Sequence, residues 1–233
     1  LLRMVQQSCV KIKLKNIKDL NNKKVINAWA IFDWANSAYS LVITTAIFPK
    51  YFMAVTDPEI HIGSITLTNS SMYAYSISMA YIIIAICSPA LSGIADSSGR
   101  KKLFLRSFTM VGATACIALF YFKGMGQLYL GAGAFILATI GFAGGLVFYN
   151  SYLPEIATED QYDKVSAKGF AYGYVGSVLL LLINLAIILK PEFFGITTAG
   201  LPARIAFVMV GMWWIGFSQI TFMYLKKKKK TAI

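Results

Sequence analysis

Long apolar stretches alternate with short polar segments along the chain. Each stretch has about 20 or more residues with few charges, the length that an α-helix needs to cross the roughly 30 Å hydrocarbon core of a bilayer. The pattern predicts an all-α membrane protein with a basic segment (1–25), a six-helix transmembrane bundle (26–225) and a lysine-rich tail (226–233). The six predicted spans cover residues 26–53, 72–94, 103–122, 127–150, 167–189 and 203–225.

Composition supports a membrane protein. The 233 residues are 57% hydrophobic and only 14% charged, whereas soluble domains have roughly 45–50% apolar and about 25% charged residues. The net charge of +12 does not indicate a nucleic-acid partner, because the basic residues lie in short segments between spans and not on one folded face. The lipid bilayer is therefore the first predicted partner.

The basic residues are distributed unevenly between the two sides of the predicted bundle. With the N-terminus inside the cell, 18 of the 22 Lys and Arg residues lie on the cytoplasmic side. Positive charge favours the cytoplasmic side of membrane proteins. We therefore expect an integral, multi-pass protein with both termini in the cytoplasm. The outer segments hold Lys50, Lys123, Lys190 and Arg204.

The first span carries the largest set of polar side chains. At 100° per residue these side chains fall within an arc of roughly 100°, which lipid does not tolerate, so we expect the arc to face other helices or a water-filled cavity. Asp33 either binds a proton or a substrate amine, or reaches the nearby interface and accepts hydrogen bonds. The predicted transport pathway consists of Asp33, Asn36, Ser37, Ser40 and Thr44. Asn184 in the fifth span either lines the same cavity or forms a helix-to-helix hydrogen bond.

Glycines gather in the fourth and fifth spans. Small residues let helices approach closely in a membrane, where packing drives association. We expect most of these glycines to serve packing. They are Gly131, Gly133, Gly141, Gly144 and Gly145 in the fourth span, and Gly169, Gly173 and Gly176 in the fifth.

The ten residues 93–102 (GIADSSGRKK) form a polar break between the second and third spans. The break is too short for a linker and too charged for lipid, so it predicts a tight cytoplasmic turn, with Gly93 and Gly99 giving backbone freedom. Its spacing of Gly93, Asp96, Gly99, Arg100 and Lys101 resembles the signature of the major facilitator superfamily (MFS) between its second and third helices.

Two further stretches narrow the resemblance. Residues 29–40 (WAIFDWANSAYS) and 148–156 (FYNSYLPEI) resemble the MFS subfamily of a fungal vacuolar amino-acid effluxer linked to autophagy and its bacterial relatives. The resemblance implies the N-terminal half of a twelve-span fold that binds substrate between two halves. It also implies that the 93–102 turn is a cytoplasmic gate, that Tyr149 and Asn150 close the inner mouth of the pathway, and that the protein lies in a bacterial inner membrane, with the vacuolar membrane as alternative.

The chain has no catalytic motif and no phosphate-binding loop. Its three cysteines have no metal-ligand spacing, and its one histidine, His61, lies in a predicted outer loop. We therefore expect neither an enzyme nor a cofactor or metal.

The patterns and the resemblance together predict transmembrane transport of a small solute, with amino acids as candidates and a proton as a candidate coupling ion. Alternating access requires a second half, so we expect the chain to be a truncated product of a longer transporter gene that lacks its C-terminal half. A homodimeric six-span carrier, in which a second copy supplies that half, remains an alternative. A membrane scaffold or inert fragment without transport activity is another, although a scaffold does not need the polar arc of the first span.

Overall fold

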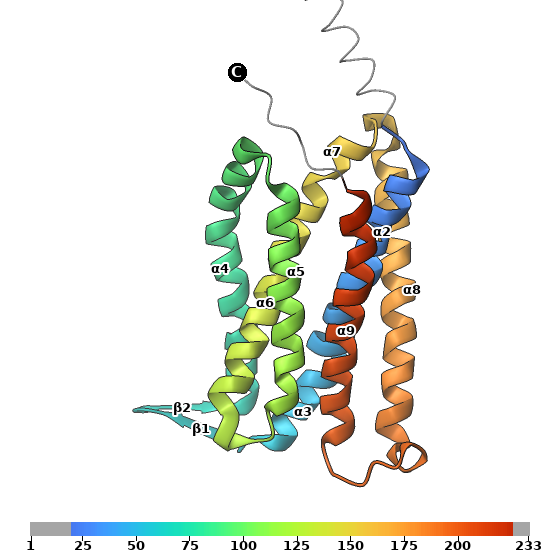
Figure 1. Cartoon of the computed structure of the whole chain (residues 1–233). Coiled ribbons are helices and arrows are strands. Elements are labelled where there is room, and N and C mark those ends of the chain that lie inside the picture. Colours follow the sequence, from blue (N-terminus) through green and yellow to red (C-terminus); the bar gives the residue numbers. More distant parts are fainter. Residues whose placement is uncertain (1–19, 226–233) are drawn as a thin grey trace, which may run out of the picture.

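The computed structural model describes residues 20–225, except for the side chains of Asp96 and Ser98. Long helices lie side by side, and both ends of the described chain lie at the same end of the bundle (Figure 1). Six of these helical segments are long and apolar enough to cross a membrane. The predicted all-α membrane fold with six spans is therefore confirmed.

Each of the six helical segments overlaps one predicted span. The first consists of α2 (Lys23–Ala38), a π-helix (Tyr39–Ile47) and α3 (Phe48–Val55); the next are α4 (Asn69–Ser98) and α5 (Lys101–Ala118). The last three are α6 (Leu128–Ser151), which is followed by the short α7 (Leu153–Ile156), α8 (Tyr162–Leu189) and α9 (Leu201–Tyr224). The 3₁₀ turns are Leu119–Tyr121, Met125–Gln127, Glu159–Gln161 and Pro191–Phe194.

A small β-hairpin lies where the sequence predicts only an outer loop. Strands β1 (Glu59–Ile62) and β2 (Ile65–Thr68) pair antiparallel. Gly63 takes a φ of 61° in the connecting turn, a conformation that glycine adopts without strain. The hairpin extends from the bundle at the end opposite to the described termini (Figure 1). His61 contacts the Thr66 hydroxyl across the strands at 2.9 Å.

The two sets of three helices pack reciprocally. α2 packs on α8 and α9, while α6 packs on α4 and α5, and α5 meets α9. If α2 exchanges places with α6, α4 with α8, and α5 with α9, each of these contacts becomes another contact of the same set. This is the arrangement of the three-helix repeats nested in each half of MFS proteins.

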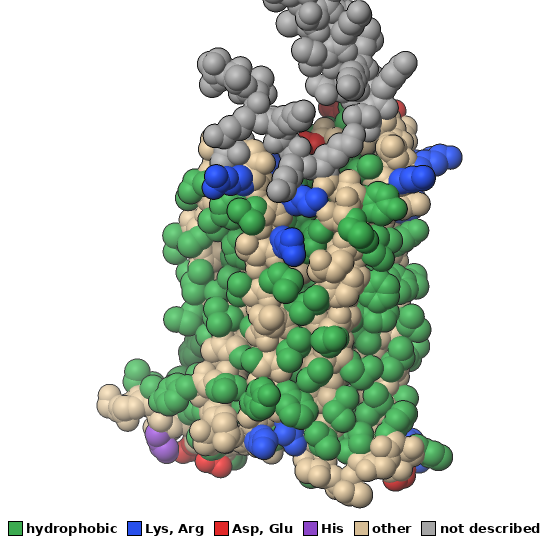
Figure 2. All heavy atoms as spheres, in the orientation of Figure 1, with side chains coloured by type: hydrophobic (Ala, Val, Ile, Leu, Met, Phe, Trp, Pro, Cys, Tyr) green, Lys and Arg blue, Asp and Glu red, His purple; other side chains and the backbone are tan. Residues whose placement is uncertain are grey.

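Two apolar clusters fill the bundle, one toward each end. In the larger cluster Phe48 stacks on Phe135 with ring centroids 4.4 Å apart. The smaller cluster lies toward the end where α2 begins and includes Trp29, Phe32 and Tyr149. Outside these clusters, hydrophobic side chains cover the middle of the visible face of the molecule, with charged side chains toward its two ends (Figure 2).

Pro49, just after the π-helix, leaves one of its backbone acceptors without a helical partner. Bonds in a π-helix join residues five apart, so the Thr44 carbonyl would accept from the residue 49 N–H, which proline lacks. The hydroxyl of Tyr73 on α4 donates to that carbonyl instead. A side chain from a neighbouring helix thus satisfies the backbone group that proline leaves unpaired, as the membrane interior requires.

Candidate functional site

The Asp33 carboxyl group lies inside the bundle between α2 and α8. It is 5% exposed and accepts a 2.7 Å hydrogen bond from the Ser37 hydroxyl. A Cβ atom at Gly173 of α8 would lie 3.0 Å from the Asp33 carboxyl carbon and 2.8 Å from the Ser37 oxygen. Within residues 20–225, no Lys or Arg forms an ion pair with this carboxylate. The absent side chain of Gly173 therefore provides the space in which an uncompensated acid is buried.

Aromatic rings enclose this acid toward the end where α2 begins. Tyr149 of α6 stacks on Trp29 with centroids 4.1 Å apart and on Phe32 at 5.1 Å. The Trp29 indole N–H also donates to the Tyr149 carbonyl oxygen at 3.0 Å. This stack lies between Asp33 and the end of the bundle where α2 begins.

The Tyr149 hydroxyl is buried and has no hydrogen-bond partner in the described structure. A Cβ atom at Gly169 would lie 2.6 Å from this oxygen. Gly169 and Gly173 are one helical turn apart on α8, about 6 Å along its axis. The hydroxyl and the Asp33 carboxylate therefore face the same glycine-lined side of α8.

Asn36 adds a second unsatisfied polar group. Its side chain is fully buried, and neither its amide nitrogen nor its amide oxygen has a partner among the described residues. It lies toward α6, where a Cβ atom at Gly145 would be 3.8 Å from the amide oxygen. Buried polar groups are nearly always paired, so Asn36 is suited to a ligand or to water.

The other predicted pathway residues are not gathered around Asp33. Ser40 and Thr44 lie in the π-helix, where the α-helical spacing assumed for the predicted arc does not apply. Asn150 is exposed. Asn184 is buried and donates to the Leu180 carbonyl at 2.8 Å. It lies 11 residues beyond Gly173, about 16 Å along α8.

The turn predicted from residues 93–102 is shorter than expected. α4 continues to Ser98, so Gly93 lies inside the helix and does not contribute to the turn. Gly99 takes a φ of 63°, and the Arg100 N–H donates to the Ala95 carbonyl at 3.1 Å. This is a Schellman C-cap, in which glycine supplies the left-handed residue. Asp96 lies in the last turn of α4.

The basic residues of this turn differ in their surroundings. The Lys101 ammonium pairs with Glu155 of α7 at 2.9 Å and also donates to the Ser151 carbonyl at 3.3 Å. Arg100 is exposed. Lys101 therefore fastens α5 to the end of α6 and α7 within this bundle, while Arg100 is presented outward.

Comparison with known proteins identifies the family. The family model described as "Vacuole effluxer Atg22 like" matches residues 21–163 and 158–233, which together cover nearly the whole chain. The chain belongs to the Atg22-like family. The protein is therefore an integral, multi-pass membrane protein related to MFS-type transporters and not an enzyme.

Curated relatives come from bacteria and fungi. An "Uncharacterized MFS-type transporter YxiO" of Bacillus subtilis is 33% identical over 189 residues, covering 81% of this chain and 43% of that protein. "Autophagy-related protein 22-1" of Phaeosphaeria nodorum is 24% identical over 198 residues, covering 70% and 35%. An uncharacterized Aquifex aeolicus protein is 26% identical, covering 80% and 43%. The Atg22-like chain thus spans less than half the length of these relatives. No solved structure matches it significantly.

Three features of the Atg22-like site were not among the predicted site residues. Glu155 pairs with Lys101 from 54 positions away, and Trp29 stacks on Tyr149 from 120 positions away. Gly173 was predicted to serve packing, and the side chains that pack against it are Asp33 and Ser37 of the candidate site. The sequence signal for Glu155 was present, because it lies in the 148–156 stretch that carries the family resemblance.

Proposed function

We propose that this chain is the N-terminal six-helix half of a transporter that moves a small solute by alternating access, with amino acids as the first candidates. The single observation that carries this proposal is the buried Asp33 carboxyl group, which has no cationic partner within residues 20–225. An ionisable group inside a membrane span costs at least about 2.5–3.5 kcal/mol on insertion scales and marks proton or substrate pathways. Family membership supports the same assignment.

We assign Asp33 the role of binding a proton or the amine of the substrate. Ser37 orients the carboxyl group, and the unpaired Tyr149 hydroxyl and Asn36 amide supply further polar contacts. Ser40, Thr44, Asn150 and Asn184 are assigned to the pathway away from this centre.

The opposite half of the transporter would close over the basic end of the bundle. Gly93, Asp96, Gly99, Arg100 and Lys101 form the cytoplasmic gate in this proposal, and the exposed Arg100 is the cation that reaches the partner half. The partner half is the C-terminal half or a second copy of the chain. Large apolar side chains on α4 and α8, such as Ile86 and Tyr174 at 73% exposure each, are open to lipid and to such a partner half alike.

We place both termini in the cytoplasm because the start of α2, the α4–α5 turn and the end of α9 share the basic end of the bundle. A bacterial inner membrane is the proposed location, supported by the bacterial relatives. The fungal relatives keep the vacuolar membrane as the alternative.

Uptake into proteoliposomes tests the transport proposal. The chain is reconstituted alone and together with the part of the Bacillus subtilis relative that it does not cover, and a pH gradient drives uptake of a ¹⁴C-labelled amino-acid mixture. We expect gradient-driven uptake by the wild type, and uptake at least about tenfold lower in Asp33→Asn, because this variant lacks only the titrating carboxyl group. Asp57→Asn, which changes an exposed carboxylate, is the matched control.

The outcomes separate the parts of the proposal. Unchanged uptake in Asp33→Asn contradicts the role of this carboxyl group, while absence of uptake in both reconstitutions contradicts transport of amino acids. Uptake by the chain alone, together with cross-linked dimers in a mild detergent, identifies a homodimeric carrier. If cross-linking in the mild detergent gives monomers alone, the homodimeric carrier is excluded.

A further inference from the structure

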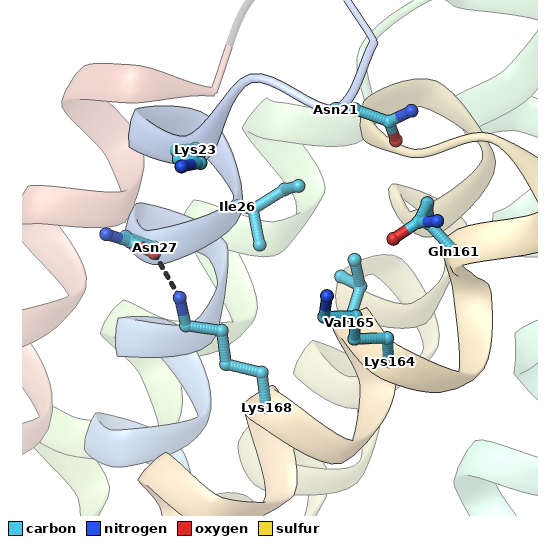
Figure 3. A pocket seen from close by; sticks show the side chains of 8 residues that line it. All are labelled: Asn21, Lys23, Ile26, Asn27, Gln161, Lys164, Val165 and Lys168. Carbon is cyan, nitrogen blue, oxygen red and sulfur yellow. Dashed lines mark hydrogen bonds between the residues drawn. The ribbon is translucent and has the colours of Figure 1, made fainter.

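A pocket lies at the basic end of the bundle, outside the candidate transport site. Its volume is about 290 Å³, and it lies between the beginning of α2 and the beginning of α8. Figure 3 shows side chains from the two helices facing one another across it. We call it the basic pocket; it is lined by Asn21, Lys23, Ile26, Asn27, Gln161, Lys164, Val165 and Lys168.

Three lysines converge on this pocket, and none of its eight described lining residues is acidic. The Lys168 ammonium donates to the side-chain oxygen of Asn27 and lies 5.7 Å from the centroid of the Tyr172 ring, so both of these partners are uncharged. Asp160 does not line the pocket, and its carboxylate accepts a hydrogen bond from the side-chain amide of the lining residue Gln161. Three like charges around one cavity repel one another, so an anion in the cavity is favoured.

The rim of the pocket is fixed by hydrogen bonds. Asn21 holds a left-handed φ of 60° and joins the start of α2 to the segment before α8. Its amide donates to the Thr158 hydroxyl at 2.8 Å, its side-chain oxygen accepts from the Thr158 N–H at 3.0 Å, and its own N–H donates to the Ile156 carbonyl at 2.8 Å. The two walls are therefore held at a fixed separation before any ligand binds.

The position of the pocket at the basic end of the bundle indicates the chemistry of its ligand. It lies where α2 and α8 begin, at the same end as Lys101 and Lys102, and Ile26 and Val165 give it an apolar side. Lysines suit phosphate oxygens as point-charge donors, and basic pockets between helices at the cytoplasmic side of membrane proteins bind anionic headgroups. Lysine charges beside an apolar wall match a phosphate attached to an apolar chain.

We propose that the basic pocket binds a phosphate group at the membrane surface, supplied by an anionic phospholipid headgroup or by free phosphate. Lys23, Lys164 and Lys168 hold the phosphate oxygens, and Ile26 and Val165 contact the glycerol end when the phosphate belongs to a lipid. Such a ligand joins α2 to α8, the two helices that enclose Asp33. This inference is independent of the transported substrate.

Binding to the purified full chain tests the proposal without a transport assay. The probes are dihexanoyl-phosphatidylglycerol, dihexanoyl-phosphatidylcholine and inorganic phosphate, with Kd measured by thermophoresis at constant ionic strength. A triple variant replaces the three pocket lysines by Gln. A matched variant changes three exposed lysines of other segments, Lys50, Lys123 and Lys190, in the same way.

We expect the pocket variant to bind phosphatidylglycerol on the order of 100-fold more weakly than the wild type, from about fivefold per lysine. The matched variant should bind like the wild type. Binding of phosphatidylglycerol without inorganic phosphate identifies a lipid site, whereas comparable binding of inorganic phosphate identifies a phosphate site. If the triple variant does not fold, the single variants Lys164→Gln and Lys190→Gln are compared instead. The first should bind phosphatidylglycerol about fivefold more weakly than the second.

Two results would overturn the proposal. One is that neither phosphatidylglycerol nor inorganic phosphate binds the wild type in the millimolar range. The other is that the pocket and matched variants lose binding equally, because the attraction would then come from the overall charge of the protein.

Discussion

The α5–α6 and α2–α8 interfaces both depend on glycine, but they use it differently. Between α5 and α6, a Cβ atom at Gly141 would lie 2.3 Å from the Gly112 Cα and 2.7 Å from the Phe108 carbonyl oxygen. Between α2 and α8, a Cβ atom at Gly173 would meet side-chain atoms of Asp33 and Ser37. At Gly141 the glycine brings two backbones into contact, while at Gly173 it makes space for polar side chains in the interior.

This difference separates structure from function. Backbone atoms cannot rotate away from an added methyl group, whereas side chains can change rotamer. Substitution of Gly141 should therefore mainly lower stability, and substitution of Gly173 should mainly disturb the polar groups that it accommodates. The following predictions test this distinction.

The largest expected effect is on the α5–α6 interface. Gly141→Ala forces two backbones apart and should cost about 3 kcal/mol of stability. Such a loss lowers the melting temperature by about 6–12 °C for a chain of this size. Fluorescence-monitored melting in a mild detergent measures it. Gly133→Ala on the same helix meets nothing within 4 Å, so a similar drop there would show that the effect belongs to the helix and not to the contact.

The α2–α8 interface should respond in function more than in stability. Gly173→Ala displaces the Ser37 hydroxyl and the Asp33 carboxyl group, side-chain groups that can move, so we expect a cost of about 1 kcal/mol. Proton-driven uptake should nonetheless fall at least about tenfold, because small misplacements of a functional group have large effects. Gly216→Ala, with open space around it, is the control. A large loss of stability with retained uptake would reverse the distinction between the two interfaces.

The two interfaces also differ at the basic end of the bundle. The α5–α6 interface is fastened there by the Lys101–Glu155 ion pair, whose side chains are 14% and 24% exposed. The α2–α8 interface is held there by a hydrogen bond from the Lys168 ammonium to the uncharged side-chain amide of Asn27. A double-mutant cycle with Lys101→Gln and Glu155→Gln should give a coupling energy of about 1 kcal/mol. The cycle with Lys168→Gln and Asn27→Ala should give less, and equal couplings would remove this contrast.

Local patterns in the sequence were enough to predict the six spans and a packing role for most glycines of the fourth and fifth spans. Apolar runs of about 20 residues predict spans because the bilayer thickness sets their length. The predicted role of glycines in packing is confirmed at Gly141 and Gly173 and fails at Gly133, which has open space around it. Nothing in the 3.6-residue period indicates which face of a helix meets a partner and which meets lipid.

Features that join distant residues were not predicted. The Thr44 carbonyl in the π-helix accepts a hydrogen bond from Tyr73, which lies 29 positions away. The basic pocket brings Asn27 and Lys168 together across 141 positions. Such pairings follow from the tertiary arrangement, and a sequence without aligned relatives contains no local signal for them. The predicted polar arc assumed α-helical spacing and so did not anticipate the π-helix that begins at Tyr39.

The smallest expected effect on stability concerns the Tyr149 hydroxyl. Tyr149→Phe removes a buried oxygen that has no partner in the described structure and keeps the ring stacked on Trp29, so the melting temperature should change by no more than about 2 °C. If the α2–α8 interface places polar groups for transport, uptake should fall although stability does not. Tyr39→Phe offers the matched case in the core, because its hydroxyl contacts Thr139 at 2.8 Å and its loss should cost about 1 kcal/mol. Retained uptake in Tyr149→Phe would assign this hydroxyl to packing and leave Asp33 and Ser37 as the functional pair of the interface.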